Sequence, residues 1–281
     1  MSTSYIIRFL KWIVLLLALN QVIYAAIVPV FFFQSPFFST DYAENISLSS
    51  LEEISIDYED GNLHGWKYGV RTDVLLLYFG GDNSDTNRWI RTVMNHNPER
   101  ISDVATVLTV DYPTFGKSTG VISEESFYKT AILLYDYAKS RYPDAEIIPA
   151  GYSIGTAAAL RLACVRECKA LVLTAPMYDG TSLYLKREGL LYSAFEPFAS
   201  VKMQNDDDAR RCYVKTMVIA SNADQVTKLK DVTALCGLFP NQPELIVLND
   251  CTHSDIWDRE EVYDSIASFI GHVLFPIERN L

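Results

Sequence analysis

The sequence is poor in basic residues, with 24 Lys and Arg against 35 Asp and Glu and a formal net charge of -11. The first 33 residues contain Arg8 and Lys11 and no acidic residue, so the remainder has 22 basic and 35 acidic residues and a net charge of -13. A nucleic-acid-binding protein needs a concentrated basic surface. We therefore expect no nucleic acid among the partners.

Metal-binding and repeat signatures are also missing. The five cysteines form no CxxC motif and no zinc-like spacing with His. Cys164 and Cys168 lie four apart on a predicted helix, where two packed thiols are a simpler interpretation than a metal or redox pair. No repeat or low-complexity segment occurs. With 281 residues, 49% of them hydrophobic, the chain can bury a large core, and we expect a single folded domain.

A nearly unbroken apolar run extends over residues 12–33, interrupted by Asn20 and Gln21. As a helix it would be roughly 33 Å long, enough for the about 30 Å hydrocarbon core of a bilayer. A cleavable signal peptide is the alternative, but its apolar core would be shorter, and Tyr24-Ala25-Ala26 is a poor cleavage site. The run therefore predicts an uncleaved transmembrane signal-anchor, preceded by a tail at residues 1–11.

The charges beside this run predict its orientation. Arg8 and Lys11 precede it, and Asp41 and Glu44 follow it. The positive-inside rule then places the N-terminus in the cytoplasm and the body on the non-cytosolic side, in a secretory lumen, the cell exterior or the periplasm. Asn45-Ile46-Ser47 is a glycosylation sequon, usable only in a eukaryotic secretory lumen.

Beyond a polar linker at residues 34–50, the pattern predicts a domain over residues 51–281. A strand hairpin at 51–70, turning at Asp60-Gly61-Asn62, is followed by short apolar runs that alternate with helical patterns. Such alternation predicts an α/β fold with a mainly parallel sheet and helices on both faces. Residues 177–211 break the rhythm and are interpreted as a small lid insertion. The expected strands are 74–79, 104–110, 146–150, 170–174, 216–220 and 244–248, and the expected helices are 87–97, 124–141, 154–168, 225–238 and 255–273.

The motif Gly151-Tyr152-Ser153-Ile154-Gly155 matches G-x-S-x-G and lies between a predicted strand and a predicted helix. In this turn the serine takes a strained conformation that brings neighbouring backbone close together, so side chains at the two glycines would clash. The turn presents the hydroxyl at a helix N-terminus, where the dipole favours developing negative charge. The motif predicts Ser153 as a nucleophile, and a merely structural tight turn is the alternative.

A serine hydroxyl is a poor nucleophile without a neighbouring base. Of the four histidines, only His253 occupies a loop after a predicted strand, at the end of a parallel sheet where catalytic groups lie. His64 lies in the early hairpin, His96 at a helix end and His272 within the last helix. The sequence predicts His253 as the general base.

The base needs a carboxylate that fixes its tautomer and stabilises its charged form. Asp224 closely follows the strand at 216–220, which gives the chain order Ser, Asp, His that G-x-S-x-G hydrolases use. Asp179, after the preceding strand, is an alternative, and Asp250 could be a local cap. Residues 206–208 are interpreted as a solvated acidic run.

An oxyanion hole requires two preorganised N–H donors. The backbone of Ile154, directly after the nucleophile, is expected to supply one. The other is expected from the loop Gly80-Gly81-Asp82-Asn83, with the N–H of Asp82 as first choice and that of Asn83 as second. The Asp82 carboxylate must then point away from the oxyanion. A simple glycine turn before a helix is the alternative.

The segment Asp111-Tyr112-Pro113-Thr114-Phe115-Gly116-Lys117-Ser118 resembles the D-Y-x-G-x-G-x-S segment of α/β-hydrolases. With the serine, aspartate and histidine loops, the resemblance covers about residues 50–275. It is greatest to the membrane-tethered branch with lysophospholipases, monoacylglycerol lipases and protein depalmitoylases. That resemblance implies the α/β-hydrolase fold, hydrolysis of acyl esters or thioesters, and no cofactor. Gly80-Gly81-Asp82 stands where the family usually has His-Gly-Asn, and Thr114 replaces a usual Gly.

Together these features predict a serine hydrolase that cleaves small-molecule or lipid acyl esters or thioesters through an acyl-enzyme. Tethering to a membrane would suit a lipid-like acyl chain. Two alternatives remain on the same fold: a non-catalytic binding module, and a different enzyme such as a peptidase or haloperoxidase.

Overall fold

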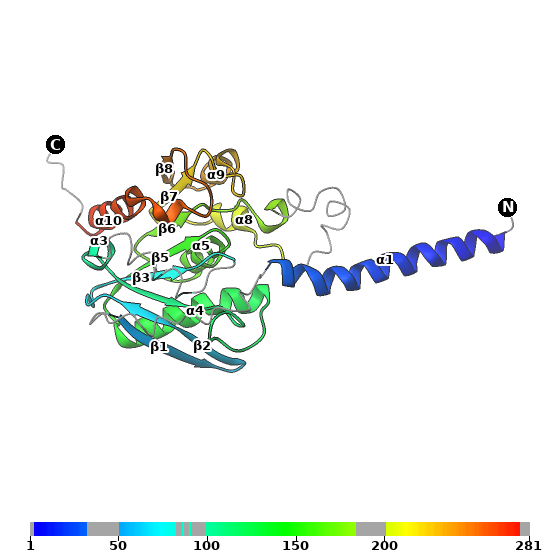
Figure 1. The fold of residues 1–281 in the computed structure, drawn as a ribbon, viewed down its shortest axis with the longest axis horizontal. Coiled ribbons are helices and arrows are strands. Elements are labelled where there is room, and N and C mark those ends of the chain that lie inside the picture. The colour runs from blue at the N-terminus through cyan, green and yellow to red at the C-terminus, as the bar shows by residue number, and fades with distance from the viewer. Residues whose placement is uncertain are drawn as a thin grey trace.

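The protein is represented by a computed structural model that describes residues 3–32, 51–82, 86, 90, 99–183 and 201–275. The described domain is built on an eight-stranded sheet with the order β1-β2-β4-β3-β5-β6-β7-β8 (Figure 1). The strands are β1 (Leu51–Tyr58), β2 (Gly61–Tyr68), β3 (Val74–Phe79), β4 (Thr106–Val110), β5 (Glu146–Tyr152), β6 (Leu171–Thr174), β7 (Thr216–Ser221) and β8 (Glu244–Leu248).

The sheet is antiparallel at one edge and parallel elsewhere. Strands β1 and β2 form the predicted hairpin, with Tyr58 opposite Gly61, and β2 pairs antiparallel with β4. All pairs from β4 through β3, β5, β6 and β7 to β8 are parallel. Every residue of β3, β4, β6 and β7 is buried, which explains their unbroken apolar character, because both faces of a parallel sheet are covered. The mainly parallel sheet is confirmed.

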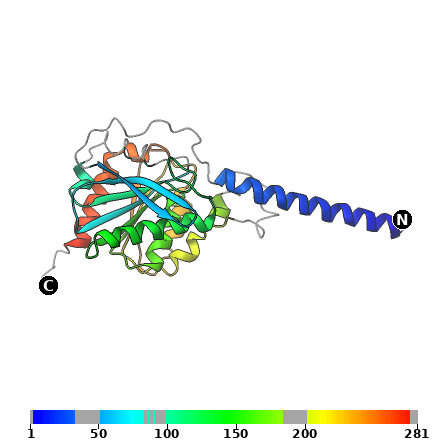
Figure 2. The same ribbon diagram turned by 90° about the horizontal axis from the view of Figure 1, so that it is seen from below.

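Helices cover both faces of the sheet (Figure 2). The sheet therefore separates the hydrophobic core into two clusters, one on each face. On one face pack α4 (Glu124–Arg141), α5 (Gly155–Val165), α8 (Asn205–Ala209) and α9 (Leu229–Cys236). On the other face pack α3 (Glu99–Ser102), the short 3₁₀ helix η3 (Ile256–Asp258) and α10 (Glu260–Leu274). Helix α4 has its predicted bounds because Ser123 and Ser126 form a reciprocal capping box at its N-terminus.

Other predicted boundaries shift for local reasons. The helix expected at 154–168 ends at Val165, so Cys168 lies beyond it, and both Cys164 and Cys168 are free thiols packed beside the core. The helix expected at 225–238 begins only at Leu229, because the side chain of Asp224 binds the preceding backbone. The linker at 34–50 and most of the helix expected at 87–97 lie outside the described residues.

Helix α1 (Thr3–Phe32) extends away from the sheet, and its side chains from residue 4 to 19 are exposed (Figure 1). The prediction of a transmembrane anchor at residues 12–33 is wrong, because no helix among the described residues is long and apolar enough to cross a membrane. Asn20 and Gln21 interrupt the apolar run on which the prediction depended. The predicted cytoplasmic tail at residues 1–11 and the non-cytosolic location of the domain depended on that anchor, so the single-pass topology is wrong as well.

The sequence predicted a solvated acidic run at residues 206–208, but this run is not uniformly solvated in the structure. The side chain of Asp208 is fully buried, and it accepts hydrogen bonds from Nε of Arg161 on α5 at 2.6 Å and Nε of Arg211 at 3.1 Å. A buried carboxylate requires such partners. The ion pair between Asp208 and Arg161 joins the end of the proposed lid to α5, the helix that follows Ser153. Residues 184–200 of the proposed lid lie outside the described residues.

His64 on β2 is a buried structural histidine. Its Nε2 contacts a carboxylate oxygen of Glu53 on β1, and its Nδ1 lies 4.0 Å from Oδ2 of Asp111. Burial on its own would lower the pKa of His64, but the two carboxylates outweigh it, so the pKa lies above its ordinary value. The ring therefore joins the β1–β2 hairpin to the segment after β4.

This raised pKa predicts a pH-dependent contribution to stability. A group whose pKa rises on folding contributes stability that is complete below its unfolded pKa, about 6.5 for His, and that is lost as pH rises through the folded-state pKa. We expect His64→Gln to be most destabilising relative to the wild type at acidic pH, and the difference to shrink toward alkaline pH. Urea denaturation between about pH 5.5 and 9 measures it, with His272→Gln on the exposed side of α10 as control. A pH-independent difference would contradict a raised pKa of His64.

Candidate active site

Ser153 lies in a sharp turn between β5 and α5, with φ of 54°. A Cβ on Gly151 would lie 2.5 Å from the carbonyl oxygen of Gly155, and one on Gly155 would lie 2.2 Å from that of Phe79. Neither position can accept a side chain without moving backbone. The two glycines of G-x-S-x-G are therefore required by close packing around the strained serine, as the sequence argument expected.

A second group of contacts holds the turn in place. The N–H of Ser153 donates to the carbonyl of Thr174 at 3.0 Å, and the hydroxyl of Thr156 donates to the carbonyl of Ser153 at 2.5 Å. Asn205 at the start of α8 donates through Nδ2 to Oγ1 of Thr156 at 3.3 Å and to the carbonyl of Met177 at 3.0 Å. Because these groups are buried, the serine has little freedom to leave its strained conformation.

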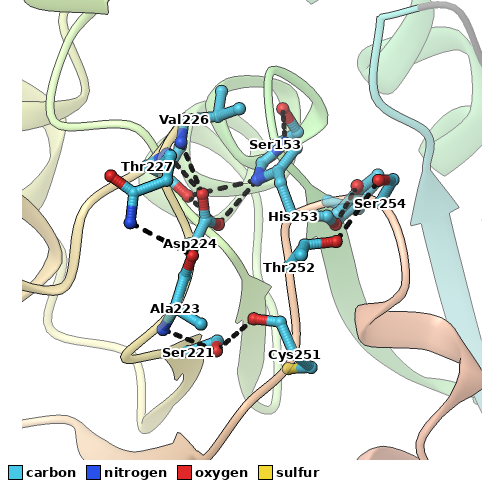
Figure 3. A network of polar contacts seen from close by, with 12 residues as sticks. Ser153, Ser221, Ala223, Asp224, Val226, Thr227, Cys251, Thr252, His253 and Ser254 are labelled. Carbon is cyan, nitrogen blue, oxygen red and sulfur yellow. Dashed lines mark hydrogen bonds and ion pairs between the residues drawn. The ribbon is translucent and has the colours of Figure 1, made fainter.

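His253 connects Ser153 to Asp224 in one hydrogen-bonded series (Figure 3). Its Nε2 lies 2.9 Å from Oγ of Ser153, and its Nδ1 lies 2.7 Å from Oδ2 of Asp224. An ionised carboxylate accepts only, so Nδ1 carries the proton and Nε2 offers its lone pair to the serine hydroxyl. The structure thus brings together all three residues that the sequence predicted as nucleophile, base and acid, from loops after β5, β8 and β7.

The Asp224 carboxylate is fully buried and saturated with donors. Its Oδ1 accepts from the N–H groups of Val226 at 2.7 Å and Thr227 at 2.9 Å, and its Oδ2 accepts from the Thr227 hydroxyl at 2.8 Å as well as from His253. Burial would raise the pKa of Asp224, but the contacts with His253 and Thr227 outweigh burial and lower it below its ordinary value. Asp224 is therefore held as an anion.

The alternative carboxylates make other contacts. Asp179 binds the N–H and hydroxyl of Ser182, at 2.6 and 2.5 Å, and so caps a local helical turn. Asp250 is exposed and has φ of 55°, and its carbonyl accepts from Arg259 at 2.7 Å. Neither carboxylate has a recorded contact with His253 in the described part of the chain. Within the same residues, no cluster of three His, Cys, Asp or Glu side chains could hold a metal ion.

The two segments expected to supply the oxyanion donors lie next to Ser153. Ile154 is the N-cap of α5, and the first N–H groups of a helix have no acceptor within the helix. A Cβ on Gly81 would lie 3.2 Å from Cβ of Ser153, so the loop after β3 passes directly beside Ser153. Asp82 ends this described stretch and is half-buried, whereas Asn83, the second choice, lies outside the described residues.

The segment at 111–118 contacts the loop after β3, which lies beside Ser153. Oδ1 of Asp111 accepts from the N–H of Thr86 at 2.8 Å, and the hydroxyl of Tyr112 donates to the carbonyl of Gly80 at 3.1 Å, which shapes the loop after β3. Gly116 has φ of 50°, and a Cβ there would meet Oδ2 of Asp111 at 2.2 Å. Thr114 stands where the α/β-hydrolases that this segment resembles usually have glycine, and it takes the left-handed conformation that glycine favours, with φ of 73°.

Sequence reasoning missed two residues that contact His253. Thr227 places Oγ1 3.4 Å from Nδ1 of His253 while donating to Asp224, and the spacing D-x-x-T could have indicated this local cap. Tyr152, the second residue of the G-x-S-x-G motif, stacks on the His253 ring. No sequence signal indicates that contact, because the two residues are 101 positions apart.

Comparison with known proteins gives sequence relatives over part of the chain. The chain is 26% identical over 170 residues to α/β-hydrolase domain-containing protein 17C of Mus musculus, a match that covers 60% of this chain and 51% of the relative. It is also 26% identical over 166 residues to α/β-hydrolase domain-containing protein aho-3 of Caenorhabditis elegans, covering 58% and 48%. The match thus spans about half the length of these curated relatives. No family model matches the chain.

Solved structures resemble most of the fold. The esterase Pf2001 of Pyrococcus furiosus superposes with a TM-score of 0.64 at 20% identity, covering 83% of this chain and 94% of the esterase. Est1E of Butyrivibrio proteoclasticus, solved with ferulic acid, gives 0.64 at 17% identity and covers 79% and 99%. A serine hydrolase without a lid from Xanthomonas campestris gives 0.60 at 16% identity and covers 82% and 97%. At such identities the likeness shows the fold alone, and that fold is the predicted α/β-hydrolase fold.

Proposed function

We propose that this α/β-hydrolase is a serine hydrolase that cleaves carboxylic esters or thioesters, with Ser153 as nucleophile, His253 as general base and Asp224 as the orienting acid. The single observation that carries the proposal is the continuous series from Ser153 Oγ through His253 to Asp224, with contacts of 2.9 and 2.7 Å. Distances of this size are within hydrogen-bond reach, as a nucleophile and its base require.

In the proposed reaction, Oγ of Ser153 attacks the acyl carbonyl while Nε2 of His253 takes its proton. The tetrahedral oxyanion accepts hydrogen bonds from the N–H groups of Ile154 and Asp82. His253 then protonates the leaving alkoxide or thiolate, which leaves a Ser153 acyl ester. Water, deprotonated by His253, attacks this ester and releases the carboxylic acid, and the proton returns to Ser153. The Asp224 anion stabilises the charged imidazolium throughout.

The proposed substrate class is broader than the lipid-like class that the sequence suggested. A lipid-like acyl chain was inferred from membrane tethering, and that support is lost with the transmembrane assignment. Esterases among the solved structures of the same fold are consistent with a small-molecule ester. The proposal therefore covers acyl esters and thioesters without specifying the acyl chain.

Covalent labelling of the wild type tests this proposal. A fluorophosphonate should form one adduct per chain, and peptide mass spectrometry should locate it on Ser153. Hydrolysis of p-nitrophenyl acetate and of a matched acetyl thioester should show a burst when acylation is faster than deacylation. A folded protein that neither labels nor hydrolyses either compound would instead support the non-catalytic binding module. Labelling without ester or thioester turnover would direct attention to amide substrates, as in a peptidase.

The Asp82 side chain provides a more demanding test of the oxyanion assignment. If only the backbone N–H of Asp82 binds the oxyanion, Asp82→Asn should change kcat by no more than a few-fold, or raise it by removing a repulsive charge. Loss of a true oxyanion donor costs about 10²–10³ in turnover. kcat for a p-nitrophenyl ester at several pH values separates the two cases. A loss of that larger size in folded protein would assign a role to the carboxylate itself.

A further inference from the structure

Tyr152 makes two distinct contacts with His253. The two rings stack with centroids 5.2 Å apart and planes inclined by 28°. The phenolic hydroxyl reaches past the imidazole and donates to the backbone carbonyl of His253 at 2.6 Å. One side chain therefore contacts both the ring and the main chain of the residue proposed as base.

The Tyr152 ring is itself wedged between other elements. Trp257 of η3 meets it edge-on, with centroids 6.1 Å apart, and Trp257 in turn meets Tyr78 of β3 edge-on at 5.5 Å. A Cβ on Gly81 would lie 3.0 Å from Cδ1 of Tyr152, so the loop after β3 closes against the ring as well. Packed on these sides, the tyrosine has little room to change rotamer.

The hydrogen bond to Asp224 leaves one motion of His253 unrestrained. It holds Nδ1 at one point, but the imidazole can still tilt about the line from Nδ1 to the carboxylate, and such a tilt moves Nε2 away from Ser153. A flat aromatic surface against the imidazole face opposes that tilt. The hydroxyl bond to the carbonyl fixes the main chain from which the imidazole projects.

We propose that Tyr152 is a positioning residue that holds the His253 imidazole in line with Ser153. This inference rests on the proposed function. Because Tyr152 directly precedes Ser153 in the chain, the same short stretch of backbone places the nucleophile and supports its base. Any shift of the strand end would then move both groups together and preserve the 2.9 Å contact between them.

Two substitutions separate the two contacts. Tyr152→Phe keeps the stacked ring and removes the hydroxyl, whereas Tyr152→Leu removes both. A misplacement of about 1 Å in a reacting group can cost about 10²-fold in rate. We expect Tyr152→Leu to lower kcat for p-nitrophenyl acetate by about that factor, with Tyr152→Phe restoring most of the loss. KM should change little, and the rate of fluorophosphonate labelling should fall in parallel with kcat, because both need the base.

Tyr135→Phe is the matched control. Its hydroxyl also donates to a backbone carbonyl, that of Glu167 at 3.1 Å, but on α4 and away from the site. We expect it to cost similar thermal stability to Tyr152→Phe and to leave kcat unchanged. Activities are compared per folded molecule, at a temperature well below the unfolding midpoint of each variant.

Three results would overturn the inference. They are a folded Tyr152→Leu variant with kcat within about threefold of the wild type, a loss confined to KM, and an equal loss in Tyr135→Phe. If Tyr152→Leu does not fold, Tyr152→Met, which also lacks the flat ring and the hydroxyl, is measured in its place against the same three results. Failure of the proposed function has a different signature, since the wild type itself would then neither label nor hydrolyse.

Discussion

Ser153→Ala should abolish covalent labelling by a fluorophosphonate and lower kcat for p-nitrophenyl acetate by on the order of 10⁶. The hydroxyl supplies the attacking oxygen, so no neighbouring group can replace it. Thermal stability should stay nearly constant, because alanine has the same backbone requirement at φ of 54° and the removed hydroxyl contacts His253 alone among its recorded partners in the described residues. Gel fluorescence, intact mass and a melting curve measure the three quantities.

Ser254→Ala is the control for this experiment. Ser254 is the exposed neighbour of His253, and its hydroxyl lies 3.5 Å from that of Thr252. The variant removes a hydroxyl from the same loop without touching the predicted nucleophile, so labelling should match the wild type. Labelling that persisted in Ser153→Ala would end the assignment of Ser153 as nucleophile. Loss of labelling in Ser254→Ala, together with an active Ser153→Ala variant, would end it as well.

The sequence carried enough information to locate the three residues in this series, because their signals are local. The glycines around Ser153 reflect packing within five residues, and the contacts of Gly151 and Gly155 have the predicted cause. Asp224 and His253 follow strands of a parallel sheet, whose carboxyl ends meet at one edge. Chain order and strand position were therefore sufficient to predict that these three side chains, distant in the sequence, lie close together.

What the sequence could not provide depends on contacts between distant elements. Stacking of Tyr152 on His253 and the burial of Asp208 between two arginines follow from how loops meet over the sheet. An acidic run beside arginines has the same pattern whether it is solvated or buried. Local composition also misled at the N-terminus, where apolar content predicted a membrane span at residues 12–33 that the described helix does not support.

The second large effect is expected for Asp224→Asn, which should lower kcat by about 10⁴. The asparagine oxygen can still accept the N–H groups of Val226 and Thr227, so the turn after β7 should keep its shape. Its amide nitrogen, placed at Oδ2, donates rather than accepts, and so faces an unprotonated Nδ1 of His253. The ring proton then moves to Nε2, where it points at the Ser153 hydroxyl and blocks its deprotonation.

Asp179→Asn provides the comparison, because it changes the same chemical group in the alternative carboxylate, which caps Ser182. It should lower the melting temperature slightly and leave kcat within a few-fold of the wild type. The opposite ranking, with Asp179→Asn inactive and Asp224→Asn mild, would mean that the wrong carboxylate had been assigned.

Since the pKa of Asp224 lies below its ordinary value, the wild-type carboxylate stays ionised above about pH 4. The difference in kcat between the wild type and Asp224→Asn should therefore persist across the neutral range, and a difference that vanished at pH 7 would contradict an orienting anion.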